Sequence, residues 1–545
     1  MPVRLAHVCL VGALLAPAPA RAVAPHALPE GADVRYGRVA ILHDDREMRI
    51  AQASGHAIID WRAFDIGEEM TVHVLQPSTE TALLNRVTGG TTSEIAGNLC
   101  ASGHVYLVNP NGIRVLPSGM IGAASFVAST LDINDRDFLD GALRFGSAAR
   151  GAMGTIVHEG QIDVDPGGFA ALLGYRVEQQ GLIHAPLSQV ALGAGTRMVL
   201  RPGRDDFLTV TQVPAIRTAG ADASAPPAIV VDGVIEAAGG QAHLEAPVIF
   251  RPQTAPDEAI HIKGDVRTGQ MGGRSGTIRI NGNGGVVRLS GLLDATSHQA
   301  DATRLRGGTV TVQGRRIVVE RGGIDASGAT GGGRVLLAAG AGAQPPGATP
   351  DGDGVREASI VVENAASISA NATRQGSAGD IHVMSDGPVL LSGRMEARGL
   401  VASSLPSAAS GYPAVLPAFQ PGISLRAGGV TFPAALPPVH PAARPVAPPL
   451  ALEPASSSSI PAAAAVENGR EAAAAFPGHV PQTPAASGPA TPGSATLGSA
   501  TSVAALPDGA PAGCAPGTAH DAAARSQLLL RRPPPIDIRW LGGNG

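Results

Sequence analysis

The sequence predicts an all-β protein: a right-handed parallel β-helix with a cap on its N-terminal end, followed by a Pro/Ala-rich tail expected to be disordered. The chain has 71 glycines among 545 residues but only 3% aromatic residues, and none between Arg251 and Gly411. Wide globular cores depend on large aromatic side chains. From about Val34, short β-branched runs alternate with Gly, Asn and Asp, which is typical of short strands joined by turns. A narrow core of stacked aliphatic rungs fits both observations.

The first 22 residues have the layout of a secretory signal peptide. A positive start at Met1–Arg4 precedes an apolar core at Val8–Leu15, and small residues offer cleavage sites after Ala20 or Ala22. The apolar run is shorter than the roughly 20 residues that a transmembrane helix needs. We therefore predict that residues 1–22 are removed during export.

Charge and motifs exclude several classes of protein. A formal net charge of −5 gives no basic footprint for nucleic acid. Beyond the signal peptide only Cys100 and Cys514 remain, too few for a disulfide-stapled scaffold. The sequence has no Gly-x-Ser-x-Gly elbow, zinc-type His pair or phosphate-cradling loop. We expect no cofactor and no metal.

A repeat can be read directly around Gly160. The tripeptide Gly160-Gln161-Ile162 recurs 21 residues later as Gly181-Leu182-Ile183. A repeat of about 20 residues with two or three short strands corresponds to one coil of a parallel β-solenoid. The spacing predicts that these two segments lie on neighbouring coils.

Residues 216–402 are predicted to continue the β-helix with a clearer unit: Gly, any residue, an aliphatic residue, an acid, then Ala. It occurs at Gly233–Ala237, Gly291–Ala295, Gly322–Ala326 and Gly393–Ala397. Right-handed β-helices also host sugar-cleaving enzymes, so the recurring acids (Glu236, Asp294, Asp325 and Glu396) could form a catalytic row. Sugar-cleaving sites combine paired carboxylates with aromatic platforms, and this stretch has no aromatic residue after Arg251. We expect solvated acids beside turns, and no catalytic residue.

The composition changes near Ser403. Residues 403–545 are dominated by Ala, Pro and Ser. Frequent proline and sparse apolar periodicity are typical of an extended or disordered segment. We predict that the ordered solenoid ends near residue 402.

The most specific segments lie between Ile59 and Leu131: Ile59–Gly67, Leu84–Gly89, Ser93–Gly97, Gly103–Ile113 and Ala128–Leu131. In order, spacing and identity this series resembles the N-terminal secretion domain of two-partner-secretion exoproteins, the filamentous-haemagglutinin family. The pattern is most similar to the high-molecular-weight adhesin branch. The resemblance runs from Val23 to roughly Asp206, and we assign residues 23–215 to this domain.

The resemblance implies a partner and a location. Its N-terminal domain would act as the secretion signal, recognised by periplasmic domains of an outer-membrane transporter. The mature chain would be secreted or displayed on the cell surface, as a monomer, with host-cell glycans or proteins as possible ligands. Adhesion is the first expectation. A haem-acquisition protein that binds a host carrier, or a polysaccharide-active β-helix enzyme, are the alternatives.

Candidate site residues follow from the same segments. Asn109-Pro110-Asn111-Gly112, followed by Ile113, supplies an Asx acceptor, a fixed φ and a glycine, as a tight turn requires. This turn holds the corner of a coil, and the resemblance implies that it also belongs to the surface that the transporter recognises. The two roles are compatible.

Two further pairs are singled out. Asn85 and Arg86 form either a buried polar pair within one coil or, as the resemblance implies, part of the recognition surface. Trp61 and Phe64 are expected to pack over the open N-terminal end of the solenoid, where strand edges would otherwise be exposed.

Overall fold

The computed structural model describes residues 23–146, 154–212, 226–246, 258–282, 284–297, 306–340 and 359–402, and the backbone of three strands between 415 and 432. The predicted signal peptide and the rest of the predicted tail lie outside the described residues. No helix in the described part of the chain is long and apolar enough to cross a membrane.

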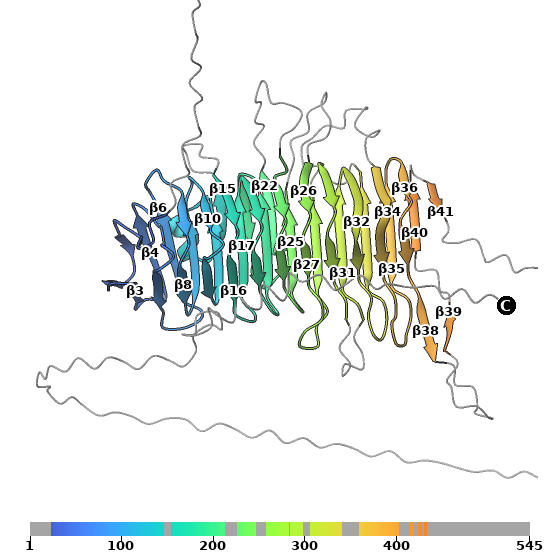
Figure 1. Ribbon diagram of the computed structural model, residues 1–545, viewed down its shortest axis with the longest axis horizontal. Coiled ribbons are helices and arrows are strands. Elements are labelled where there is room, and N and C mark those ends of the chain that lie inside the picture. Colours follow the sequence, from blue (N-terminus) through green and yellow to red (C-terminus); the bar gives the residue numbers. More distant parts are fainter. Residues whose placement is uncertain are drawn as a thin grey trace, which may run out of the picture. The chain divides into compact units, whose positions relative to one another are not determined.

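The chain winds into a parallel β-helix whose coils have up to three strands, one on each of three faces (Figure 1). Within each face the strands of successive coils pair in parallel, as β10, β15 and β18 do. Face 1 contains β7 (Ser93–Ile95), β10 (Ile113–Val115), β15 (Thr155–His158), β18 (Arg176–Gln179), β23 (Ile229–Val231), β26 (Glu258–Ile262), β29 (Val286–Leu289), the first halves of β32 (Arg316–Asp325) and β34 (Ser359–Ser369), and β36 (Val389–Leu391).

Face 2 follows face 1 around each coil. It contains β2 (Val39–His43), β3 (Glu47–Gln52), β5 (Thr71–Leu75), β8 (Asn98–Ala101), β11 (Met120–Ala123), β16 (Gln161–Val164), β19 (Leu182–His184), β24 (Val234–Glu236), β27 (Asp265–Arg267), β30 (Leu292–Asp294), the second halves of β32 and β34, and β37 (Arg394–Glu396). Gln161 pairs with Leu182 and Ile162 with Ile183. The 21-residue repeat and the predicted parallel β-helix are therefore confirmed.

Face 3 is a 14-stranded sheet. It contains β1 (Asp33–Tyr36), β4 (His56–Trp61), β6 (Ala82–Val87), β9 (His104–Val108), β12 (Ser125–Ser129), β17 (Phe169–Gly174), β20 (Gln189–Ala194), β25 (Gln241–Glu245), β28 (Thr277–Asn281), β31 (Thr309–Gly314), β33 (Arg334–Ala339), β35 (Asp380–Ser385), β40 (Ile423–Ala427) and β41 (Val430–Phe432). A separate antiparallel pair joins β38 (Gly399–Ala402) to β39 (Val415–Ala418).

The strands β39, β40 and β41 lie within the segment predicted to be a disordered tail. β40 extends face 3 by pairing in parallel with β35. Its sequence, Ile423-Ser-Leu-Arg-Ala427, alternates apolar and polar residues as a strand does. The boundary predicted at residue 402 is therefore too early for the ordered chain.

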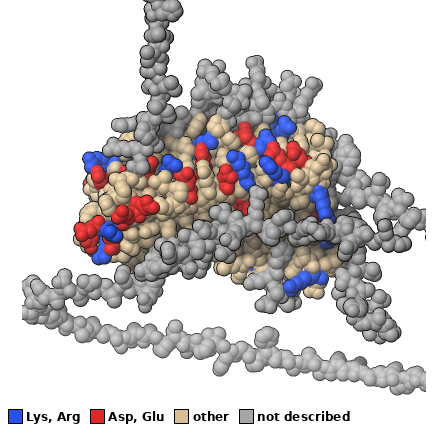
Figure 2. All heavy atoms as spheres, viewed as in Figure 1, with Lys and Arg blue, Asp and Glu red and all other residues tan. Residues whose placement is uncertain are grey.

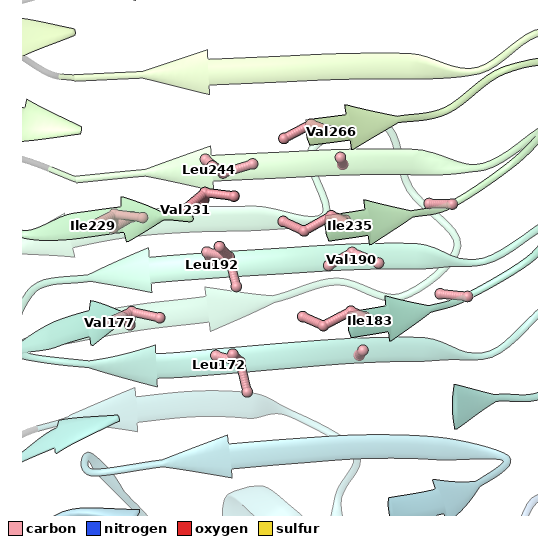
Figure 3. Close-up of a cluster of buried hydrophobic side chains, with 14 of the residues drawn as sticks. Leu172, Val177, Ile183, Val190, Leu192, Ile229, Val231, Ile235, Leu244 and Val266 are labelled. Carbon is pink, nitrogen blue, oxygen red and sulfur yellow. The ribbon is translucent and has the colours of Figure 1, made fainter. Parts of the chain in front are cut away.

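The inner core is a stack of aliphatic rungs. Leu172, Leu192 and Leu244 lie one above another on consecutive strands of face 3, and Ile183 and Ile235 do the same on face 2 (Figure 3). Each of these side chains has no exposed surface. Strand alternation sends every second side chain inward, so a core this narrow is filled by Val, Ile, Leu and Ala.

A column of glycines forms the corner between faces 1 and 2. A Cβ on Gly181 would lie 2.0 Å from the carbonyl oxygen of Gly160, and one on Gly233 would lie 2.1 Å from the oxygen of Gly181. No side chain fits at that distance. The corner explains why each repeat unit begins with glycine.

The N-terminal end is capped by antiparallel pairing. β1 pairs with β4, and β2 pairs with β3, against the parallel direction of the coils. Trp61 and Phe64, expected to pack over this end, are each 1% exposed within the core of the first coils, with ring centroids 5.6 Å apart. Strands β1 and β2 pair with the edge strands β4 and β3, which satisfies backbone N–H and C=O groups that would otherwise be free.

A second, smaller sheet lies on the outer side of face 3, and the sequence did not predict it. Its antiparallel strands are β13 (Asp132–Ile133), β14 (Leu143–Gly146), β21 (Arg197–Leu200) and β22 (Leu208–Gln212), with α1 (Asp135–Leu139) between the first two. We call these elements the cover. A hydrophobic cluster separate from the inner core fills the space between the cover and face 3.

Candidate functional site

The corner at Asn109 joins the end of β9 to the start of β10. The Asn109 side chain is fully buried, and its Nδ2 donates 2.9 Å hydrogen bonds to the carbonyl oxygen of Thr91 and to Oγ of Ser93, on the preceding coil. Its backbone N–H donates to the oxygen of Ser129 on the following coil, also at 2.9 Å. Asn109 therefore joins three successive coils by hydrogen bonds.

The rest of the turn divides between core and surface. Oδ1 of Asn109 accepts 3.0 Å hydrogen bonds from both the backbone N–H and Nδ2 of Asn111. Gly112 has φ +123°, a conformation that favours glycine. Ile113 is buried in the inner core, whereas Pro110 is half-buried and Asn111 exposed. In the folded domain only Pro110 and Asn111 of this motif are accessible to another protein.

Asn85 belongs to the interior of the coils. It is fully buried on β6, where Oδ1 accepts a 3.0 Å hydrogen bond from Nε1 of Trp61. Its Nδ2 lies 3.5 Å from the carbonyl oxygen of Tyr106, at the limit of a hydrogen bond. Asn85 thus satisfies the one polar atom that the Trp61 side chain brings into the core.

Arg86 points to the opposite side of the same strand, so Asn85 and Arg86 are not a pair. Adjacent side chains on a strand face opposite ways, and this was the error in the predicted pairing. The Arg86 guanidinium lies 3.3 Å from Asp60, 2.9 Å from Asp132 and 2.7 Å from Asp135. It also donates a 2.7 Å hydrogen bond to the carbonyl oxygen of Ile133. Arg86 therefore fastens the start of the cover to face 3.

The electrostatics of this cluster follow from its burial. Burial works against the charge of the Arg86 guanidinium, but Asp132 and Asp135 outweigh it and raise the pKa of Arg86 above its ordinary value. Burial also raises the pKa of the Asp60 carboxyl, and Arg86 and Arg35 offset only part of this effect. With its side chain 14% exposed, Arg86 is committed to this network in the folded domain.

The recurring acids of the repeat units, Glu396 included, stand in one column of face 2, but Arg267 and Ser369 interrupt them. The backbone register aligns Glu236, Arg267, Asp294 and Asp325 on successive coils. Asp294 and Asp325 each accept a hydrogen bond from the backbone N–H two residues ahead, at 2.9 and 2.8 Å. These bonds hold the following turn, as Asx turns do.

Positive and negative side chains mix over the surface in view in Figure 2, without a continuous basic field. Arg114 with Glu159 and Arg176 with Glu178 are examples of such pairs on face 1.

The same N-terminal segments are found in known proteins. The family model of the TPS (two-partner secretion) secretion domain matches residues 26–245. Residues 26–245 are a TPS secretion domain. The crystal structure of the HMW1 secretion domain from Haemophilus influenzae matches with a TM-score of 0.55 and 26% identity, covering 68% of this chain and 91% of that domain.

Two curated relatives share parts of the TPS domain. A heme/hemopexin-binding protein of Haemophilus influenzae strain Rd is 35% identical over 163 residues, 29% of this chain and 18% of the relative. Another heme/hemopexin-binding protein of Haemophilus influenzae is 44% identical over 87 residues, 16% of this chain and 9% of the relative. The matched part of the chain thus spans less than a fifth of either relative.

Proposed function

We propose that this chain is an exoprotein that leaves the cell through a partner outer-membrane transporter, with the TPS domain as its secretion signal. The observation that carries the proposal is the match of residues 26–245 to the TPS secretion domain. The folded geometry adds a constraint. Because Asn85, Asn109 and Ile113 are fully buried, the transporter can contact them only in a chain that has not yet folded.

Pro110 and Asn111 separate recognition from folding in an experiment. Pro110→Ala and Asn111→Ala change accessible parts of the turn, whereas Pro117→Ala changes an exposed turn between β10 and β11 and serves as the matched control. Each variant is expressed with and without the partner transporter, and mature protein is measured in the supernatant and on the cell surface. Export that needs the partner, and that falls in the first two variants but not in Pro117→Ala, supports the proposal.

Equal export with and without the partner transporter would contradict the proposal. Asn109→Ala belongs in the same series, with the melting temperature of any exported protein as a second readout. A loss of export accompanied by normal stability of the exported fraction indicates recognition. A loss accompanied by a large fall in melting temperature indicates that Asn109 acts through folding alone.

For the exported protein we propose adhesion, without catalytic activity. Support comes from the long lateral faces of the solenoid beyond the TPS domain. On face 3 the outward side chains Thr277, Arg279, Thr309 and Thr311 form a polar, at least partly exposed surface with no aromatic platform. Binding of purified mature protein to host cells tests this role. Release of sugar from a glycan substrate would contradict the non-catalytic assignment.

A second function is favoured by the two relatives, whose names describe binding of heme and hemopexin. We propose as the alternative that the exported chain captures a haem carrier. Purified protein would be titrated with haem-loaded and haem-free hemopexin, with serum albumin as the control. Saturable binding to hemopexin without binding to cells would replace adhesion by this alternative.

A further inference from the structure

The outer side of face 3 is apolar over its first coils. Ile58, Leu84, Tyr106 and Val127 point outward from β4, β6, β9 and β12, and none is more than 5% exposed. On β28 and β31 the outward positions of the same face are polar, as at Thr277 and Thr311. The cluster beneath the cover contains these side chains together with Ala171 and Ala191 of β17 and β20, so the cover excludes water from this flank of the first coils.

The cover is assembled from two excursions that are far apart in sequence. β13, α1 and β14 leave the coil after β12, and β21 and β22 leave after β20. The central pair of the sheet joins the two excursions: Leu143 pairs with Leu200, and Phe145 pairs with Met198. Two complete coils lie between them in sequence. The second excursion lies against the later strands, with Met198 over Gly193 of β20 and the Leu208 N–H 3.4 Å from Nδ1 of His243 on β25. The hydrophobic cluster that joins both excursions to the outward side chains from β4 to β20 is therefore incomplete until the chain has reached β22.

The first excursion is fastened early in the chain. Arg86 on β6 binds Asp132 and Asp135, at the start of this excursion, at 2.9 and 2.7 Å. Phe138 of α1 packs edge-on against the ring of Tyr106, with centroids 5.3 Å apart. This half alone covers only part of the apolar flank.

The second excursion is fastened by a strap, residues 201–207, that joins β21 to β22. Gln189 of β20 accepts a 2.7 Å hydrogen bond from the N–H of Gly203 and donates a 2.8 Å bond to the oxygen of Arg204. Beneath β21, a Cβ on Gly193 would lie 2.6 Å from Sδ of Met198. Glycine at this position lets Met198 reach face 3 directly.

We propose that the cover is a closing latch: the coils from β4 to β12 stay marginally stable until β21 and β22 arrive, and the closing of the cover then locks all of them in one cooperative step. The order of events rests on the proposed function, in which the chain emerges from a transporter segment by segment. Burial of the shared apolar cluster drives the closing step. Because its two halves are distant in sequence, closing is the slowest contact to form. Once it has formed, the domain no longer unfolds back into the transporter.

Two substitutions on one strand test the latch in the full mature chain. Met198→Asp places a charge between the cover and face 3, where the side chain is fully buried. Val199→Asp places the same charge one residue away, on the opposite and partly exposed side of β21. Hydrogen exchange is then measured peptide by peptide. We expect Met198→Asp to speed exchange in β6, β9 and β12 at least tenfold and Val199→Asp to leave them unchanged.

The strands β31, β33 and β35 serve as an internal reference, because they lie beyond β28, whose Arg279 still donates a 2.9 Å hydrogen bond to the carbonyl oxygen of Asp205 in the strap. The expected result leaves their exchange unchanged in both variants. Faster exchange confined to the cover, with β6, β9 and β12 still protected, would overturn the latch. If Met198→Asp unfolds the reference strands as well, the milder variant Met198→Ala replaces it. The latch then requires that Met198→Ala speeds exchange in β6, β9 and β12 and leaves the reference strands unchanged.

The exchange experiment is independent of the transporter, so the two proposals fail separately. A chain that shows upstream loss of protection but leaves the cell without a partner contradicts only the proposed function. A chain that needs its partner but shows no upstream effect of Met198→Asp contradicts only the latch. For the export step we expect Met198→Asp to lower the amount of mature protein outside the cell at least threefold relative to Val199→Asp.

Discussion

The indole Nε1 of Trp61 donates a 3.0 Å hydrogen bond to Oδ1 of Asn85, and both side chains lie inside the first coils with at most 1% of their surface exposed. A narrow aliphatic core rarely includes an indole, because the indole N–H must find a partner when it is buried. Here β6 supplies that partner from the strand next to β4. The pair allows the widest side chain of the TPS domain to fill the capped end of the solenoid.

The first prediction concerns this pair. Asn85→Ala leaves the Trp61 N–H buried without its acceptor, and an unsatisfied buried donor costs about 1–3 kcal/mol. We expect a loss of that size in the free energy of unfolding, measured by denaturant titration. Asn98→Ala, on the half-exposed side of β8, is the control and should cost less than about 1 kcal/mol.

Trp61→Phe shows whether the hydrogen bond or the loss of volume dominates. If the bond dominates, Asn85→Ala costs much less in a Trp61→Phe background than in the native chain, because residues in contact are energetically coupled. Strictly additive costs would show that the two side chains act independently, and that the hydrogen bond between them does not stabilise the first coils.

The second prediction concerns the glycine corner. Gly181→Ala places a Cβ 2.0 Å from the carbonyl oxygen of Gly160, so neighbouring coils must separate and their ladder hydrogen bonds must stretch. We expect a loss of about 3 kcal/mol or more, in the range of severe overpacking. Gly55→Ala is the matched control, because a Cβ there meets nothing within 4 Å. Equal melting temperatures for the two variants would contradict the corner geometry.

The coils of the solenoid could be predicted from the sequence, and the glycine corner shows why. In a solenoid each residue stacks on its equivalent in the next coil, so the spacing between Gly160 and Gly181 is enough to indicate the register of β16 and β19. The cover could not be predicted in this way. Its pairing of Leu143 with Leu200 is antiparallel and nonlocal, and neither strand repeats a pattern found elsewhere in the chain.

The candidate site was predicted unevenly. A turn at Asn109 could be expected from the sequence alone, because Asn-Pro-Asn-Gly determines its own turn geometry locally. The partners of Arg86 were missed, because Asp132 and Asp135 come from an excursion more than two coils later. The predicted pairing of Asn85 with Arg86 was avoidable, since strand alternation alone places neighbours on opposite sides.

The third prediction concerns Arg86. Arg86→Met keeps the length of the side chain but leaves Asp60, Asp132 and Asp135 without their shared cation. Breaking a largely buried charge network by removing one partner costs about 3–5 kcal/mol, and the partial exposure of Asp132 and Asp135 reduces this to about 2 kcal/mol. Thermal unfolding of the purified chain measures the loss. Arg136→Met, at an exposed ion pair on α1, should change stability by less than about 1 kcal/mol.

The fourth prediction concerns acid. His158 on face 1 is fully buried, and neither ring nitrogen has a hydrogen-bond partner among the described residues. Burial lowers the pKa of His158 to about 3, and burial likewise lowers the pKa of His243 to about 4. In the unfolded chain both groups titrate near about 6.5. As the pH falls below this value, both histidines therefore become protonated in the unfolded state while they stay neutral in the folded state.

The stability that these groups contribute is complete above about pH 6.5 and is lost as the pH falls toward 3 for His158 and toward 4 for His243. Within that window, each histidine lowers the free energy of unfolding by up to about 1.4 kcal/mol for each unit by which the pH falls. His158→Leu removes the contribution of His158 and leaves that of His243. The fall in unfolding free energy between about pH 6.5 and 4.5 should therefore be smaller by about 2–3 kcal/mol. His43→Leu, at an exposed position on β2, should leave the slope unchanged. A native slope in the His158→Leu variant would show that His158 is protonated without unfolding, and that its burial is not maintained in solution.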